Sequence, residues 1–410
     1  MCIVAPIRVL RPQRQYVADV ASLPYDVLSI EEARKITQNN SLSFLRVEKA
    51  EIDMPDHAYR GCVYETAKRN LEALIEKKVM RREETACYYV YRQKMGNHEQ
   101  YGIVGGIAID EYLSDRLKKH EQTRTNKELD RTRHIDTVNA QTGPVFVAYK
   151  ARQDIDRLVE KITGHPTEYD FVSDDGIAHT VWLIKRQEDI DTLRKSFADV
   201  QSLYIADGHH RAAAAVAVGK KRRAQERGSG NKPYDYIMAV LFPHNQLDIM
   251  AYNRVVKDLC KMDESAFLRR VEGSFHVTKA FSQKRPERLR EFGMYLSGQW
   301  YKLTMNKTGP GIPDPVSNLD VSILQNHLLK PILQIDDPKT DKRIDFVGGI
   351  RGVEELERLV DSRKFAVAFS LYPTTLDQLV AVADAGKMMP PKSTWFEPKL
   401  RSGIFVHPLW

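Results

Sequence analysis

The sequence predicts an α+β fold that is divided into several sections. Strand-like segments with alternating apolar residues and amphipathic helical segments are mixed along the whole chain. At 410 residues the chain is too long for one ordinary domain and long enough for two or three sizeable cores. Hydrophobic residues make up 42% and charged residues 29%, which is typical of a soluble globular protein. We expect three sections, with residues 1–112, 113–230 and 231–410.

The first section, 1–112, is expected to mix short strands with helices. A helix begins after Ser29, because a serine cap followed three residues later by Glu32 forms a capping box. Apolar residues at helical spacing predict a second helix over 58–80. Residues 86–109 alternate about the turn Gly96-Asn97, so this segment is expected to be a β-hairpin.

The middle section, 113–230, begins with a charged loop and helix that lead into an apolar strand at 144–149. Residues 179–185 and 202–208 are strand-like, and residues 188–199 between them have helical spacing.

The last section, 231–410, begins with a strand at 234–242. Helices are expected around Ala266 and Leu324, and a further strand at 365–373. The pair Pro390-Pro391 ends any helix and predicts an extended loop that carries Lys392, Ser393 and Thr394.

Composition narrows the function classes. The net charge of +7, from 62 basic and 55 acidic residues, is too small and too diffuse to indicate nucleic acid by itself. The four cysteines are far apart and form no C-x-x-C pair, so neither a disulfide framework nor a zinc site is expected. No apolar run is long enough for a signal peptide or a membrane span. These observations fit a cytoplasmic protein.

The stretch "YIADGHHRAAAAVAVGK" at 204–220 is the strongest functional signal. An apolar strand ends at Asp207, Gly208 permits a tight turn, and His209, His210 and Arg211 begin an alanine-rich helix that we expect to end at Gly219. The start of a helix exposes backbone N–H groups and partial positive charge, and these three side chains would add donors there. The pattern predicts a phosphate site, with Asp207 placed to hold Mg²⁺ or a substrate group. The alternative is that the histidines are ordinary structural groups.

The same residues resemble known families. Strand, G-x-x-R and alanine-rich helix are similar to the nucleotide-binding motif of the ParB/sulfiredoxin superfamily, and the form D-G-H-H-R resembles that of its free L-serine kinases. The whole chain also resembles a bacterial and archaeal family of unknown function, number 1015. That resemblance is carried by "LPYDVLS" at 23–29, "HEQT" at 120–123, "IADGHHRAAAA" at 205–215, "YNRVVKDL" at 252–259, "LDVSILQNHLL" at 319–329 and "ADAGKMMPPKSTWFEPKLRSG" at 383–403.

The resemblance implies a ParB/sulfiredoxin-like nucleotide-binding core with additional N-terminal and C-terminal α+β sections. Sulfiredoxin has a cysteine where His209 stands, so its thiol chemistry is not expected. ParB-type proteins lack the leading acid and carry a helix-turn-helix that we do not find. In the serine kinases a glutamate ahead of the motif activates the substrate hydroxyl, and Glu121 stands in a comparable place. A solvated loop glutamate is the alternative for Glu121.

Several other residues are weaker candidates for binding substrate or phosphate. His120 and Thr123 flank Glu121 in the family-like segment, and Tyr25 and Asp26 would close the substrate pocket or form only a tight turn. Lys392 lacks the setting of a P-loop, but is a candidate point charge for phosphate.

The sequence therefore predicts a kinase that transfers a phosphoryl group from a nucleotide to free L-serine, giving O-phospho-L-serine. ATP is the expected donor, ADP is the alternative, and Mg²⁺ is the expected cofactor. Glu121 would accept the hydroxyl proton, Asp207 would act with the metal, and Gly208 to Arg211 would hold the phosphates. The rival functions are a nucleotide-binding regulator and a ParB-like protein associated with nucleic acid. We expect no membrane partner and no nucleic-acid partner, and the oligomeric state stays open.

Overall fold

The computed structural model describes residues 2–54, 62–226, 231–279, 281–306 and 314–410. The chain divides into two compact units. Unit 1 contains residues 1–247 and 398–410, and unit 2 contains residues 248–397. Both units mix helices and strands, so the α+β class is confirmed.

Unit 1 is built on one large mixed sheet with the strand order β6-β11-β8-β12-β5-β4-β10-β9, and β1 pairs with β5. Its strands are β1 Val4–Ala5, β4 Tyr88–Met95, β5 His98–Ala108, β6 Leu117–Lys118, β8 Val145–Tyr149, β9 Tyr169–Val172, β10 Ala178–Ile184, β11 Leu203–Asp207 and β12 Tyr236–Pro243. The expected hairpin is confirmed, since β4 and β5 are antiparallel and Met95 pairs with His98 across the turn. Strand β8 lies between β11, to which it is antiparallel, and β12, to which it is parallel.

This sheet differs from the sections expected from the sequence. It takes β4 and β5 from residues 1–112, β8 and β11 from 113–230, and β12 from 231–410. The expected boundaries at 112/113 and 230/231 therefore fall inside unit 1. The physical reason is that strand pairing joins segments far apart in the sequence, which composition along the chain does not show.

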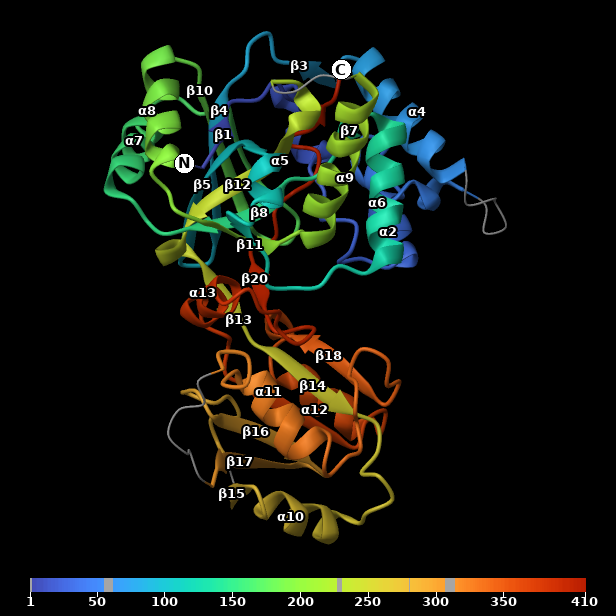
Figure 1. The fold of residues 1–410 in the computed structure, drawn as a ribbon. Coiled ribbons are helices and arrows are strands. Elements are labelled where there is room, and N and C mark those ends of the chain that lie inside the picture. The colour runs from blue at the N-terminus through green and yellow to red at the C-terminus, as the bar shows by residue number, and fades with distance from the viewer. Residues whose placement is uncertain (1, 55–61, 227–230, 280, 307–313) are drawn as a thin grey trace. The chain divides into compact units, whose positions relative to one another are not determined.

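Helices and short strands surround the sheet of unit 1 (Figure 1). The helices are α1 Val17–Val20, α2 Ile30–Thr37, α3 Leu45–Glu48, α4 Cys62–Glu76, α5 Ile109–Leu113, α6 Thr125–Val138, α7 Gln153–Thr163, α8 Gln187–Ala198 and α9 His209–Glu226. Two small ladders pair β2 Leu10–Pro12 with β3 Met80–Arg82, and β7 Ala140–Gln141 with β21 His407–Pro408. The Ser29 capping box of α2 is confirmed. Helix α4 lies inside the expected helix 58–80, of which residues 58–61 are outside the described residues.

The core of unit 1 follows the alternation of its strands. Tyr88 and Val90 of β4 share one hydrophobic core with apolar residues of α7, α8 and α9. Tyr89 and Tyr91 point to the opposite face because successive strand side chains alternate, and both rings contact Phe405 from the last residues of the chain. The C-terminal segment 398–410 is thus part of unit 1, and this return places it near the motif.

One expectation about α9 is wrong. Gly219 does not end the helix, which continues to Glu226. A Cβ at Gly219 would lie 2.5 Å from the backbone oxygen of Tyr234, so glycine is needed here for a close approach inside the helix. Helix α6 lies alongside α9 (Figure 1).

Unit 2 has its own antiparallel sheet with the order β15-β17-β16-β19-β14-β18. Its strands are β13 Asp248–Met250, β14 Tyr252–Val256, β15 Phe275–Lys279, β16 Glu291–Leu296, β17 Gln299–Met305, β18 Ile344–Gly348, β19 Val367–Leu371 and β20 Trp395–Glu397, of which β13 and β20 form a separate pair. Its helices are α10 Glu264–Glu272, α11 Asp320–Leu324, α12 Glu354–Asp361 and α13 Leu376–Asp384. Leu356, Leu359 and Val360 of α12 pack into the hydrophobic core of this unit. Across both units, none of the described helices is long and apolar enough to cross a membrane.

Candidate functional site

The D-G-H-H-R motif forms the expected strand, turn and helix. Strand β11 ends at Asp207, α9 begins at His209, and Gly208 between them has a φ of +95°. This left-handed conformation favours glycine, and a Cβ at Gly208 would also lie 3.1 Å from Nε of Arg211. The turn is stabilised by the backbone N–H of Gly208, which donates to Oδ1 of Asp207 at 2.8 Å.

The carboxylate of Asp207 lies between two cations. Its Oδ2 is 3.3 Å from Nζ of Lys399 and 3.8 Å from Nη2 of Arg211. Burial alone would raise the pKa of Asp207, but Lys399 and Arg211 hold this pKa well below its usual value. Asp207 is therefore ionised at neutral pH, and about 30% of its side chain is exposed.

Lys399 is the functional candidate that sequence reasoning missed. It lies 192 residues after Asp207 and reaches the motif only because segment 398–410 returns to unit 1. The family-like segment 383–403 contains both Lys392 and Lys399, and the sequence analysis predicts a phosphate-binding role for Lys392 alone. Nothing in the local pattern distinguishes the two lysines.

The guanidinium of Arg211 faces the protein interior. Only 8% of this residue is exposed, and Nη1 donates to the backbone oxygen of Pro144 at 2.6 Å. Burial lowers the pKa of Arg211, but the carboxylates of Asp207 and Asp26 outweigh this effect and raise it above the usual value. Arg211 thus fixes the geometry of Asp207 and of the start of β8.

The two histidines of the motif attach a distant loop to α9. Nε2 of His209 accepts from the backbone N–H of His120 at 3.4 Å, and Nε2 of His210 accepts from the backbone N–H of Arg124 at 2.9 Å. Burial lowers the pKa of both imidazoles, and for His209 the neighbouring His120 adds to the effect. The sequence suggested side-chain donors to phosphate, whereas these Nε2 atoms act as acceptors inside the protein.

The loop held in this way carries Glu121. Its Oε2 lies 4.0 Å from Nδ1 of His209, and 45% of the Glu121 side chain is exposed. Because Nε2 of His209 accepts a hydrogen bond, the proton of the neutral ring is on Nδ1, which faces this carboxylate. Glu121 therefore lies close to the motif in space, although it is far from Asp207 in the sequence.

The neighbours of Glu121 in the loop have different surroundings. His120 is 2% exposed, its ring meets that of His209 edge-on at 4.5 Å, and burial lowers its pKa to about 4. Thr123 donates from Oγ1 to Oε2 of Glu128 at 2.8 Å. His120 is thus a packing partner of His209, and Thr123 ties the loop to α6.

Tyr25 and Asp26 also lie in the environment of the motif. The guanidinium of Arg131 is 4.1 Å from the centre of the Tyr25 ring, and burial raises the pKa of Tyr25. The charge of Asp26 raises the pKa of Arg211 and opposes the lowering at His210. Lys392 belongs to unit 2, where its ammonium is 5.4 Å from the centre of the Tyr252 ring, so its role at the site stays a prediction.

Arg211 also lines a small polar cavity. Its volume of about 20 Å³ has room for a single water molecule. The lining residues are Glu48, Arg131, His134, Ile135, Gln141, Thr142, Gly143, Val145 and Arg211. Arg131 and Glu48 form an ion pair in it at 3.9 Å.

A protein-only metal site is not indicated by the part of the chain that the structure describes. No group of three or more His, Cys, Asp or Glu side chains there is arranged to hold a metal ion. Asp207 is a single ionised carboxylate, which fits Mg²⁺ only as an ion shared with nucleotide phosphates.

Comparisons with known proteins give a family and distant structural similarities. The family model described as "Protein of unknown function (DUF1015)" matches residues 4–322. No curated protein matches the sequence. A point mutant of a free serine kinase in complex with AMP is 13% identical, with 72% of this chain and 86% of that chain covered and a TM-score of 0.36. A conserved hypothetical protein from Pyrococcus furiosus is 14% identical, with 75% and 97% covered and a TM-score of 0.35. These TM-scores are too low to carry an argument, so the function has to be inferred from the residues of this chain.

Proposed function

The chain belongs to the DUF1015 family, and from that premise we propose that it is a kinase that transfers a phosphoryl group from a nucleotide to free L-serine. The product would be O-phospho-L-serine, with ATP as the expected donor and ADP as the alternative. The observation that carries the proposal is the approach of Glu121 to the start of α9, beside the ionised Asp207. We further propose that β11 and α9 belong to a ParB/sulfiredoxin-like core.

The nucleotide phosphates would lie on the first turn of α9. Helix geometry leaves the backbone N–H groups of His209, His210 and Arg211 without partners inside the helix, and they carry the positive end of its dipole. Lys399 and Arg211 add positive charge within 4 Å of Asp207. The backbone donors that the sequence predicts therefore stay the proposed phosphate ligands, whereas the imidazoles of His209 and His210 are no longer proposed as additional donors.

Mg²⁺ would be held by Asp207 together with the phosphates. When bound, the ion neutralises charge that develops on the transferred group. Asp207 suits this role because it stays ionised at neutral pH and remains partly exposed. Asp207→Asn should lower turnover, and a higher Mg²⁺ concentration should restore part of it. Restoration by Mg²⁺ would be absent if Asp207 only stabilised the turn.

Glu121 would act as the base on the acceptor side. The serine hydroxyl oxygen forms a bond to the transferred phosphorus, the bond from phosphorus to the leaving nucleotide oxygen breaks, and the hydroxyl proton goes to the Glu121 carboxylate. His209 would be a positioning residue, since its neutral Nδ1–H faces this carboxylate. Tyr25, Asp26, His120 and Thr123 would shape the acceptor side, and a role for Lys392 stays a prediction.

The nucleic-acid alternative loses support from the basic run at the end of α9. Lys221 and Arg222 pair with Asp136, and Arg223 pairs with Asp110 and Asp235. Cations that are paired in this way offer less charge to a phosphate backbone.

The proposal is tested by giving the protein a choice of acceptors. Purified protein is incubated with Mg²⁺, ATP or ADP, and a mixture of amino acids and hydroxy acids, and the products are identified by mass spectrometry. The expected new product is phosphoserine. A different phosphorylated acceptor would overturn the serine assignment and keep the kinase, and nucleotide binding without any product would favour the regulatory alternative.

A further inference from the structure

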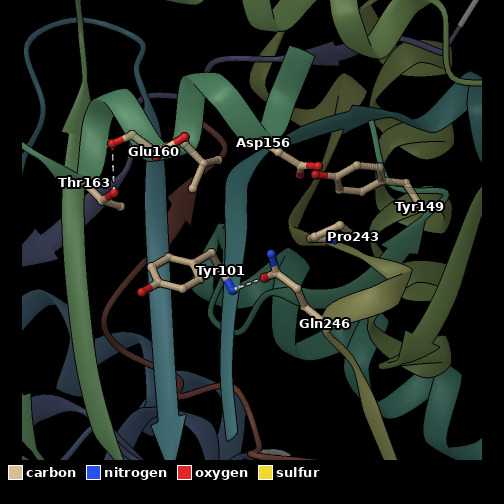
Figure 2. A pocket seen from close by; sticks show the side chains of 8 residues that line it. Tyr101, Tyr149, Asp156, Glu160, Thr163, Pro243 and Gln246 are labelled. Carbon is tan, nitrogen blue, oxygen red and sulfur yellow. Dashed lines mark hydrogen bonds between the residues drawn. The ribbon is translucent and has the colours of Figure 1, made fainter. Parts of the chain in front are cut away.

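A second pocket lies in unit 1 (Figure 2). The register of the sheet places it at the opposite end of β11 from the motif. Its volume is about 260 Å³, slightly below the range of pockets for drug-sized ligands. The lining residues are Tyr101, Tyr149, Asp156, Val159, Glu160, Thr163, Pro243 and Gln246. In the sheet, Tyr149 of β8 pairs with Leu203 at the start of β11, whereas Phe146 pairs with Asp207 at its end. The length of β11, roughly 13 Å, therefore separates this pocket from the motif.

Two aromatic residues form the walls of the pocket, and their own packing holds them in place. Tyr149 is 1% exposed, and its ring meets that of Phe197 in α8 at 5.4 Å. Tyr101 in β5 packs on Trp182 with 6.4 Å between ring centres, and its backbone N–H donates to Oε1 of Gln246 at 2.8 Å. Both tyrosine rings are thus held in place by their packing within unit 1.

Helix α7 brings acidic groups to the same pocket (Figure 2). Asp156 is half-buried, and Figure 2 shows the Tyr149 hydroxyl directed toward its carboxylate; burial, and then the charge of Asp156, raises the pKa of that tyrosine. Glu160 is exposed, one turn further along α7. Within the described residues, neither Asp156 nor Glu160 forms an ion pair, and no lysine or arginine lines the pocket.

The carboxylate of Asp156 has no positively charged partner among the described residues. The nearby Arg152 pairs with Asp154 and Asp199. Burial and the charge of Asp154 both raise the pKa of Asp156. A cation that entered the pocket would relieve this repulsion, and an anion would increase it.

We propose that this pocket is a binding site for a small organic ammonium ion, separate from the nucleotide site. The partly exposed ring of Tyr101 can attract a cation, and the carboxylate of Asp156 adds charge attraction. The lining favours a compact ammonium head group over an inorganic cation, because only the organic ion can also bury apolar surface against Val159, Pro243 and the tyrosines. The site is independent of the kinase proposal, because none of its lining residues belongs to the motif or its loop.

The test uses choline and its neutral isostere 3,3-dimethyl-1-butanol as probes. Binding of each is measured by calorimetry or NMR titration to the full chain without nucleotide. Choline should bind at least about 10-fold more tightly than the isostere, because only choline carries the charge that the rings and Asp156 attract. Asp156→Asn, which keeps the shape and removes the charge, should weaken choline by about 10-fold and leave the isostere unchanged.

Two further variants distinguish a specific loss of choline binding from a general effect of charge and from a folding defect. Glu188→Gln removes an exposed carboxylate on α8 that pairs with Arg186, and should leave choline binding unchanged. Tyr101→Leu, which removes an aromatic wall, supplies a second variant if Asp156→Asn fails to fold. Equal affinity for choline and its isostere, no binding of choline, or choline binding unchanged in a folded Asp156→Asn or Tyr101→Leu protein would overturn the proposal.

Discussion

His134 provides a test of how the surroundings of the motif respond to acid. It lies in α6, is 2% exposed, and contacts the backbone oxygen of Val47 through Nε2 at 3.0 Å. Burial, with a further contribution from Arg131, lowers its pKa from 6.5 to about 4. We expect the replacement His134→Gln, which keeps an amide N–H for Val47 but cannot titrate, to reduce the sensitivity of stability to acid.

The sign and size of the effect follow from this pKa. Between pH 6.5 and pH 4 the unfolded chain binds a proton at His134 that the folded chain does not, so stability falls as pH falls. The full shift of 6.5 − 4 = 2.5 units corresponds to about 3 kcal/mol at 1.36 kcal/mol per unit. Most of it, about 2 kcal/mol, is expected between pH 7 and pH 5.

The measurement is the free energy of unfolding of the wild-type protein and the His134→Gln variant, from urea titrations followed by circular dichroism at pH 7 and pH 5. The wild-type protein should lose about 2 kcal/mol more than the variant over this interval. Other groups that titrate in the same range cancel in this comparison. An equal loss in the two proteins would refute the assignment of a buried neutral imidazole.

Three further predictions concern single positions. Gly219→Ala should lower the free energy of unfolding by about 1–3 kcal/mol, because the added Cβ would collide with the backbone oxygen of Tyr234. Urea titrations measure this change, and a more stable variant, as is usual when alanine replaces glycine inside a helix, would contradict the prediction. Burial raises the pKa of Asp320 to about 7, so its stabilising contribution is present below pH 3.8 and is lost as pH rises through 7. Asp320→Asn should therefore raise the free energy of unfolding at pH 8 by up to about 4 kcal/mol, because the pKa shift of 7 − 3.8 = 3.2 units corresponds to 1.36 kcal/mol per unit. A substitution that changes the free energy of unfolding equally at pH 8 and pH 4 would contradict this raised pKa. His210→Ala should speed amide exchange at Arg124 by about 5- to 10-fold, since a backbone N–H loses its acceptor, and unchanged protection in hydrogen-exchange mass spectrometry would show that the loop is held otherwise.

Local signals predicted the local parts of the fold. The hairpin of β4 and β5 was visible because alternation and a Gly-Asn turn are properties of neighbouring residues. The position of β8 between β11 and β12, and the return of residues 398–410 to unit 1, depend on contacts between distant segments. The end of α9 could not be predicted from local sequence either. Glycine often marks a helix end, but Gly219 is needed for its close approach to Tyr234, which is a tertiary contact.

For the candidate site, too, the sequence predicted the local backbone structure and not the contacts between distant segments. The strand, turn and helix at Asp207 and Gly208 follow from residue types in order, and the structure has them. The direction of each side chain was not visible, so the acceptor roles of His209 and His210 could not be anticipated. Lys399 could not be chosen in advance, because its closeness to Asp207 arises from tertiary structure alone.

The central claim is that Glu121 serves phosphoryl transfer to L-serine at the start of α9, and it is tested most directly by following labelled phosphate from nucleotide to serine. Wild-type protein and Glu121→Gln are compared at saturating serine, with ATP labelled on its γ-phosphate or ADP labelled on its β-phosphate, and nucleotide affinity is measured in parallel. The account predicts labelled phosphoserine from the wild-type protein, a fall of about 100- to 10,000-fold in turnover for Glu121→Gln, and an unchanged nucleotide affinity. Wild-type protein that gives no serine-dependent product with either nucleotide would contradict the account, and near wild-type turnover in Glu121→Gln would remove Glu121 from it.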